Sequence, residues 1–135
     1  MTESKQITSQ RRTLEQDRAK GAWKVVQAAK KKPDSEKYGQ LAKKGTTDIL
    51  TSGLGQTLAF WKAKGKSHHL ALFEDVSAWV IERMKIKADQ GLLVWVINEA
   101  NSVTYRQARV EALAFLAWVK RFAEAELTKE EEINP

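Results

Sequence analysis

Apolar residues recur at intervals of three and four along most of the chain, which is the spacing of an amphipathic α-helix. The first such pattern predicts a long helix over residues 8–31, a stretch without Pro that ends at the KKKPD segment. Its apolar positions are Leu14, Ala22, Val25 and Ala29. The opposite side, at about 100° per residue, is predicted to be a basic outer face. That face carries Arg12, Gln16, Lys20, Lys24, Gln27 and Lys31.

Three further helices are predicted in the middle of the chain. Asp34 is a candidate N-cap for helical structure over residues 35–52, but one interrupted helix and two short ones both fit. A single interior Gly such as Gly45 costs only about 1 kcal/mol, so it does not decide between one helix and two. Residues 56–63 resume the helical pattern after the glycines at 53 and 55. Ser67 is a candidate N-cap for a helix from His68 to about Lys87.

The last third of the chain is the most apolar. Residues 92–97, LLVWVI, would suit a strand by composition, but no second strand candidate exists to pair with them, so a short buried helix is predicted. Asn101 or Ser102 is expected to cap the final helix, which is apolar on every side from Ala112 to Val119. Such a helix belongs in the centre of a bundle or against another protein, and the centre is the favoured interpretation.

The predicted fold is all-α: a single compact bundle of about six helices with a long basic N-terminal helix and a strongly apolar C-terminal helix. At 135 residues, one core suffices. We expect a single helical domain over residues 8–127, a flexible N-terminus over residues 1–7 and an acidic tail over residues 128–135.

Composition narrows the classes of protein. The chain has no Cys, which excludes a disulfide framework and a thiolate metal site and fits a reducing cytosol. No apolar run approaches the ~18 residues of a membrane-spanning helix, and the first residues do not resemble an export signal. We therefore expect a cytoplasmic protein without membrane contact.

Positive charge is concentrated in the first half. Up to Lys66 there are 15 Lys and Arg against 6 Asp and Glu, whereas from Ser67 onward there are 8 against 11. Such asymmetry concerns partners rather than fold, and the basic half is where a polyanion would bind.

Chemical motifs fail when their context is tested. The AKGKS segment, residues 63–67, lacks the earlier Gly and the preceding strand of a phosphate-binding loop, and GLG at residues 53–55 lacks the strand of a dinucleotide site. His68 and His69 are adjacent on a predicted helix and cannot share a metal as an i, i+4 pair would. Glu74 and Asp75 are neighbours on a surface turn rather than a facing dyad. We expect no catalytic residues, no metal and no cofactor, and hence no enzyme.

Basic and aromatic residues remain. Trp23 and Trp61 lie among lysines, away from the clearest apolar stripes. An exposed Trp beside Lys suits stacking with nucleic acid and equally suits a protein interface, and a place at the rim of the core is the alternative for either Trp. Lys rather than Arg, Asn or Gln dominates, which suits phosphate contact without sequence preference.

Three segments together resemble one known family. They are YRQARVEALAFLAWVKRFAEAEL at residues 105–127, LAKKGTTDILTSGLGQTLAFWKAKGK at residues 41–66, and RAKGAWKVV at residues 18–26. In this order they are similar to the small helical subunit of the Cmr complex, the type III-B CRISPR RNA-guided effector. One departure lies at Gly45 and Thr46, where the family more often has an apolar residue followed by Pro.

The resemblance implies an all-helical, non-catalytic subunit of an antiviral complex that cleaves foreign RNA. It implies partners among the backbone and large Cmr subunits, further copies of the chain stacked along the filament, and the duplex of guide RNA and target RNA. Guide pairing supplies sequence specificity, so this subunit is expected to contact target-RNA phosphates only.

The expected RNA-facing residues are all basic, and we hypothesise that they line one surface. They are Arg12, Arg18, Lys20, Lys24, Lys30, Lys31, Lys32, Lys43, Lys44, Lys62, Lys64 and Lys66. Candidates for the subunit interface are Trp23, Trp61, Tyr105 and Arg106. Alternative interpretations are a helical protein-interaction adaptor without RNA contact, the equivalent small subunit of a type III-A complex, and a stand-alone DNA-binding regulator.

Overall fold

The computed structural model describes the backbone of residues 2–127 and the side chains of residues 13–127. Within this range the chain forms six α-helices and no strand, which confirms the all-α prediction. The helices are α1 (Thr2–Lys30), α2 (Ser35–Ser52), α3 (Leu54–Lys64), α4 (Ser67–Met84), α5 (Leu92–Asn98) and α6 (Ser102–Glu126). The acidic tail predicted for residues 128–135 lies outside the described residues.

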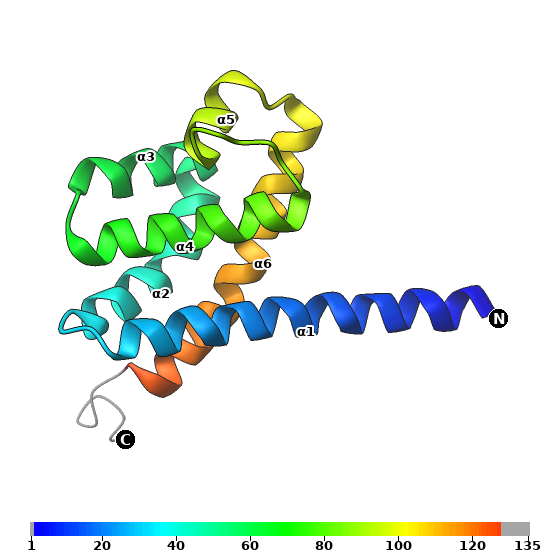
Figure 1. Cartoon of the computed structure of the whole chain (residues 1–135), viewed down its shortest axis with the longest axis horizontal. Helices are drawn as coiled ribbons and strands as arrows, with labels where there is room; N and C mark the ends of the chain where they lie inside the picture. The colour runs from blue at the N-terminus through cyan, green and yellow to red at the C-terminus, as the bar shows by residue number, and fades with distance from the viewer. Residues whose placement is uncertain (1, 128–135) are drawn as a thin grey trace.

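The bundle is assembled around α6. This helix runs behind α4 and α1 in the view of Figure 1 and packs against α1, α2 and α4. Its residues Ala112, Phe115, Leu116 and Val119 are almost completely buried, which confirms that the apolar C-terminal helix is central. A helix surrounded on three sides needs apolar residues around most of its circumference, and this explains its unusual composition.

The first helix is longer than predicted. It begins at Thr2 instead of Thr8. The reason is that no Gly or Pro precedes Gly21, so nothing in the sequence interrupts the helix. It ends at Lys30 because Pro33 lacks an N–H and disfavours helical geometry in the residue before it.

Residues 35–52 form one helix, which settles the alternative that the sequence left open. Gly45 lies inside it, and a Cβ placed there would come within 3.4 Å of the Trp61 ring and 3.5 Å of Leu116. Both are ordinary van der Waals distances, so the packing does not require Gly at this position. One interior Gly costs about 1 kcal/mol, which is too little to break α2.

Two of the predicted helix caps differ from those in the structure. Asp34 occupies the N-cap position of α2, but its side chain makes no capping hydrogen bond. Lys66, not Ser67, is the N-cap of α4, because its extended backbone precedes a helix in which Ser67 is already the first residue. Of the two residues predicted as the cap of α6, Asn101 is the one that caps it. Its side chain accepts a hydrogen bond from the Thr104 N–H at 2.9 Å, and the Thr104 hydroxyl accepts one from the Asn101 N–H.

The prediction of a buried helix at residues 92–97 is only half right. α5 is helical, but Leu92 is its only fully buried residue and Ile97 is 69% exposed. Consecutive apolar residues on a helix point about 100° apart. Because α5 packs only against α3 and α4 to any extent, its far side faces outward.

Candidate nucleic-acid interface

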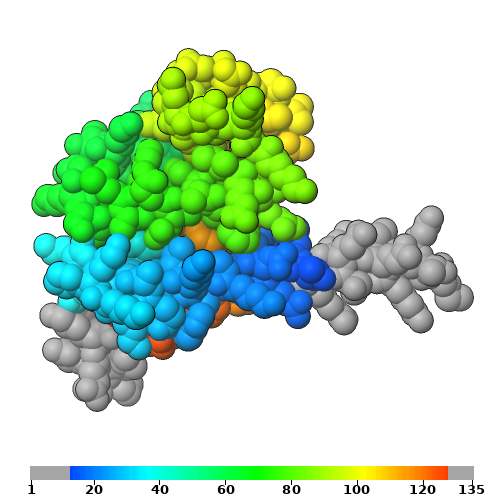
Figure 2. Space-filling view, viewed as in Figure 1, coloured from blue at the N-terminus to red at the C-terminus, as the bar shows by residue number. Residues whose placement is uncertain are grey.

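The turn between α1 and α2 and the turn between α3 and α4 lie at the same edge of the molecule (Figures 1 and 2). Lys32 and Lys37 line a depression of about 390 Å³ together with Ser67, the first residue of α4. Beyond the effect of burial, the charges of Lys37 and Lys66 lower the pKa of His68, and those of Lys64 and Lys66 lower the pKa of His69. We call this region the basic end. It comprises Lys31, Lys32, Lys37, Lys62, Lys64 and Lys66, and all six side chains are exposed.

Carboxylates are fewer than ammonium groups at the basic end. Asp34 and Glu36 line the same depression as Lys32 and Lys37. Asp75 lies close enough to Lys32 for that charge to lower its pKa, although burial, the larger effect, raises the pKa of Asp75 above its usual value. The balance of charge at this edge is positive, as a phosphate-binding surface requires.

A row of lysines on α1 leads to the basic end. Residues 20, 24 and 31 fall within about 40° of one another around a helix and span about 17 Å along it. Lys20, Lys24 and Lys31 are all exposed. We call Lys20 and Lys24 the α1 row. Lys20 also borders the groove between α1 and α4, where Asp17 and Arg83 form an ion pair at 3.4 Å.

The other basic residues predicted to face RNA, apart from Arg18, are paired, less exposed, further from the basic end, or outside the described side chains. The Lys30 ammonium lies 3.2 Å from the Glu126 carboxylate on α6. Lys43 is half-buried, and the exposed Lys44 lies in the middle of α2, about 14 Å along the helix from the α1–α2 turn. The side chain of Arg12 is outside the described residues.

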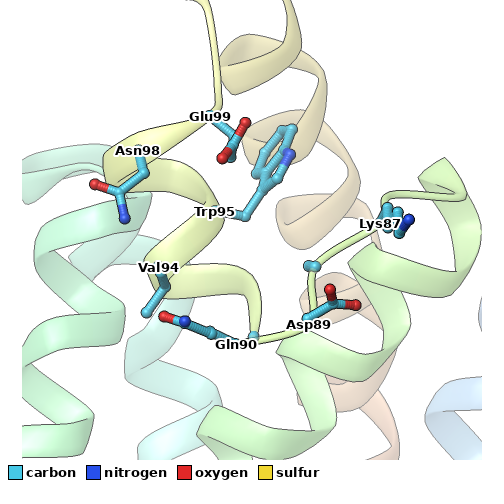
Figure 3. Close-up of a pocket in the computed structure, with 9 residues that line it drawn as sticks. Lys87, Asp89, Gln90, Val94, Trp95, Asn98 and Glu99 are labelled. Atoms are coloured by element: carbon cyan, nitrogen blue, oxygen red, sulfur yellow. The ribbon is translucent and has the colours of Figure 1, made fainter.

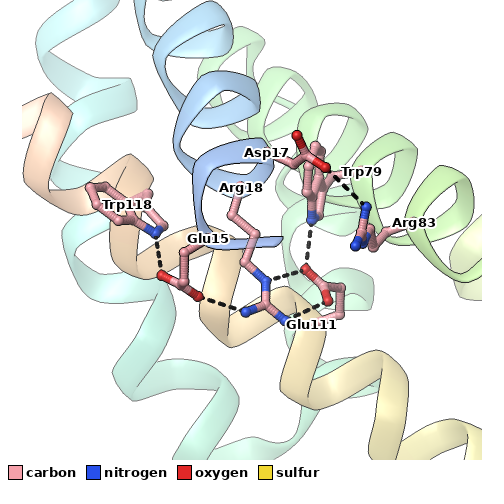
Figure 4. Close-up of polar contacts among 7 residues, drawn as sticks. All are labelled: Glu15, Asp17, Arg18, Trp79, Arg83, Glu111 and Trp118. Carbon is pink, nitrogen blue, oxygen red and sulfur yellow. Dashed lines mark hydrogen bonds and ion pairs between the residues drawn. The ribbon is translucent and has the colours of Figure 1, made fainter. Parts of the chain in front are cut away.

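Arg18 must be removed from the predicted set. Its guanidinium donates to both carboxylate oxygens of Glu111, at 2.9 and 2.8 Å, and to Glu15 at 2.7 Å (Figure 4). Only 14% of its side chain is exposed. Hydrogen bonds with Glu111 raise the pKa of Arg18, so the cation is permanent but already neutralised by two carboxylates. Arg18 therefore ties α1 to α6 and does not present a free cation on the surface.

Trp61 must also be removed, this time from the candidates for the subunit interface. It is 1% exposed and belongs to the core, between α2 and α4. Its neighbour Phe60 is 44% exposed instead. Adjacent helical residues point about 100° apart, and the sequence did not show which of the two aromatic rings faces the core.

The other interface candidates lie in different surroundings. Trp23 is 45% exposed and meets Phe122 of α6 edge-on, with ring centroids 5.2 Å apart. The Tyr105 hydroxyl accepts a hydrogen bond from the Gly55 N–H at 3.3 Å, which ties the start of α6 to α3. Arg106 is exposed. Trp23 and Arg106 are thus the two candidates whose side chains are exposed on the surface.

Among the described side chains, no group of three His, Cys, Asp or Glu residues is arranged to hold a metal ion. The two most buried carboxylates have structural partners: Glu111 binds Arg18 and Trp79, and Asp75 accepts a hydrogen bond from the Tyr38 hydroxyl at 2.7 Å. His68 and His69 pack on each other, with ring centroids 4.2 Å apart.

A depression of about 210 Å³ lies at the far end of α4, where the loop to α5 passes Trp95 (Figure 3). Lys87, Asp89 and Glu99 give it mixed charge. Pockets for small molecules usually enclose about 300–1,000 Å³, so this one is below that range. The basic end is the stronger candidate for a binding surface.

Comparison with known proteins decides the family. The family model described as CRISPR-associated protein (Cas_Cmr5) matches residues 14–126. The chain belongs to the Cas_Cmr5 family. This membership confirms the resemblance to the small Cmr subunit that three separate segments of the sequence indicated.

Two Cmr5 relatives agree with this membership. The CRISPR system Cmr subunit Cmr5 of Thermus thermophilus is 33% identical over 114 residues, which cover 84% of this chain and 96% of the relative. The X-ray crystal structure of a CRISPR-associated Cmr5 family protein from Thermus thermophilus superposes with a TM-score of 0.72 at 30% identity, over the same shares of the two chains. Among residues 2–127 of this Cmr5 family member, no helix is long and apolar enough to cross a membrane.

Two residues at this edge of the molecule were not predicted from the sequence as part of a binding surface. They are Lys37 of the basic end and Phe60, which precedes Trp61 on α3. Lys37 had a usable signal, because it follows the same α1–α2 turn as Lys31 and Lys32. Phe60 had none, because its exposure depends on which side of α3 meets α2 and α4.

Proposed function

We propose that this chain is the small, non-catalytic subunit of a type III-B Cmr effector complex and contacts the phosphates of the target RNA. The supporting observation is the basic end, where lysines from two distant turns form one exposed positive surface. The α1 row extends this surface along the first helix. The proposed RNA-facing residues are Lys20, Lys24, Lys31, Lys32, Lys37, Lys62, Lys64 and Lys66.

Lysine chemistry suits this role. An ammonium group is a compact charge that contacts a phosphate without reading the base. In an RNA-guided complex, base pairing with the guide selects the target. Copies of the subunit stacked along the complex would each neutralise a stretch of target backbone, and cleavage of the foreign RNA would be carried out by other subunits.

Salt dependence of RNA binding tests this proposal. The full chain is titrated against a fluorescently labelled RNA at several salt concentrations, and the slope of log affinity against log salt is measured. A triple variant, Lys31→Gln, Lys64→Gln and Lys66→Gln, is expected to lower the magnitude of this slope by about two, because each lost phosphate contact to a single strand removes about 0.7.

The matched control removes the same charge elsewhere. Lys85→Gln, Lys87→Gln and Arg109→Gln change three exposed cations at the other end of α4 and on α6. This variant is expected to keep the wild-type slope. An equal decrease of the salt slope in both variants would mean that net charge alone attracts RNA. No RNA retention by the chain, alone or in the reconstituted complex, would leave a protein-interaction adaptor as the function.

A further inference from the structure

Phe60 is a large aromatic ring left 44% exposed within the basic end. It lies on α3, directly before the buried Trp61 and four residues before Lys64, the last residue of the helix. The Lys64 ammonium lies 5.6 Å from the centre of its ring. The exposed ring gives this charged region an apolar aromatic face in contact with water.

The His69 ring extends the aromatic surface. It lies 6.3 Å from Phe60 with the two planes 30° apart, and the His68 ring follows 4.2 Å beyond it. Burial lowers the pKa of both histidines, and nearby cations lower it further. The charged groups near His68 are Asp34, Lys37 and Lys66. Those near His69 are Lys64 and Lys66, and the titratable His68 ring also lies beside it. At neutral pH the imidazoles are therefore mainly uncharged rings.

Cations flank this aromatic surface on α3 and on the turn that follows. Lys62 reaches over the Phe73 ring of α4 at 6.0 Å, so two of the three flanking lysines lie over aromatic faces. All three ammonium-bearing side chains, Lys62, Lys64 and Lys66, are exposed and can turn toward a ligand. The surface thus combines an aromatic face with several mobile positive charges, which is the combination that binds unpaired nucleotides.

We propose that Phe60, with Lys62, Lys64 and Lys66 around it, binds an unpaired nucleotide of an RNA strand. The base stacks on the phenyl ring and the ammonium groups contact the phosphates on either side. This inference rests on the proposed function and adds to it a preference for single-stranded over duplex RNA, because both faces of a paired base are already covered by its neighbours in the helix.

The test compares single-stranded with duplex RNA of the same length. Phe60→Leu removes the ring but keeps an apolar helix-forming side chain. It is expected to weaken single-strand binding about fivefold or more and to leave duplex binding unchanged. Phe60→Tyr keeps the ring and is expected to retain wild-type affinity. Leu70→Ala removes another exposed apolar side chain, 40% exposed on α4, and is expected to change neither affinity.

Three other outcomes would contradict the proposed stacking site, and each points to a different explanation. Wild-type single-strand affinity in Phe60→Leu, or an equal loss on duplex, contradicts it while the salt slope still supports phosphate contact. Loss of assembly with Cmr subunits, with RNA affinity intact, assigns Phe60 to a protein interface. If the wild-type chain and its complex bind no RNA, the proposed function fails as well.

Discussion

The Glu111 carboxylate joins three helices. It lies on α6 and accepts hydrogen bonds from Arg18 of α1 and from the Trp79 indole N–H of α4, which is 2.9 Å away (Figure 4). Burial alone would raise the pKa of Glu111, but the hydrogen bonds from Arg18 and Trp79 outweigh burial and leave it below its ordinary value. The ionised carboxylate is therefore part of the folded state.

We predict that Glu111→Gln lowers the free energy of unfolding at pH 7 by about 2–4 kcal/mol, because the partly buried Arg18 then keeps only the exposed Glu15 as its anion. A carboxyl whose pKa is lowered by folding stabilises the protein above its unfolded pKa, near 4.5, and this stabilisation is lost as pH falls through the folded value. Urea unfolding at pH 7, 5 and 3 should show a weaker acid dependence in the variant.

The control for this prediction is Glu124→Gln. Glu124 pairs at 3.3 Å with Arg121, whose side chain is 73% exposed, so the change should be within about 0.5 kcal/mol. Similar effects of the two substitutions would contradict a structural role for Glu111. Arg18→Met should likewise destabilise the fold while leaving RNA affinity unchanged, since Arg18 does not face the solvent as a free cation.

The histidines of the basic end predict a pH effect on RNA binding. Their pKa values are below the ordinary 6.5, chiefly through burial, and phosphates bound nearby would raise them. Protons are then taken up on binding, so RNA affinity should rise about three- to tenfold as pH falls from 7.5 to 5.5. Anisotropy titrations should show this rise, and His68→Gln with His69→Gln should flatten it. An unchanged slope in the double variant contradicts the coupling.

At the scale of helices, positions could largely be predicted from the sequence, and contacts between helices could not. Helical spacing and Gly or Pro breaks located all six helices. The side of α3 that is buried, by contrast, follows from its packing between α2, α4 and α5. For the same reason the lysines could be identified as basic, whereas Arg18 and Glu111, 93 residues apart, could not be paired.

Gly21 sets how closely α1 approaches α4. A Cβ at this position would lie 2.6 Å from the Trp79 ring, which is stacked on Phe115 with centroids 4.9 Å apart. Because Trp79 is also held by its bond to Glu111, it cannot move aside easily. We predict that Gly21→Ala lowers stability by about 1–3 kcal/mol despite its better helix propensity.

The matched control for Gly21→Ala is Gly55→Ala in α3. There a Cβ would meet Val96 at 3.4 Å, an ordinary contact, so stability should stay the same or rise. Thermal and urea unfolding measure both variants. A stable Gly21→Ala would show that α1 can shift outward from α4, and that the approach of these helices is not limited at Gly21.

At the scale of the molecule, a second surface is distinct from the basic end. Trp23, Phe122 and Trp118 form an aromatic patch between α1 and α6, with Trp118 and Phe122 centroids 5.6 Å apart. Glu15, which pairs with Arg18, accepts a hydrogen bond from the Trp118 indole N–H at 3.0 Å. Aromatic residues are enriched at protein interfaces, so the patch suits contact with another protein subunit.

We predict that Trp23→Ser weakens incorporation of the chain into a reconstituted Cmr complex by about tenfold, the usual size of a central aromatic contact. Its RNA affinity and salt slope should stay at wild-type values. Leu50→Ser, on α2 and 61% exposed, is the control. Co-purification with the other subunits measures both variants. Full incorporation of Trp23→Ser would exclude Trp23 from the subunit interface.

The sequence by itself determined the all-α class, the central place of the last helix and the family, because periodicity, chain breaks and segment similarity are local along the chain. Only the tertiary structure decided which charges and aromatic rings are available. Arg18 is neutralised by a residue from α6, Trp61 is buried by other helices, and Lys37 and Lys66, which follow different turns, both lie near His68. Availability depends on neighbours distant in sequence, and folding alone brings those neighbours together.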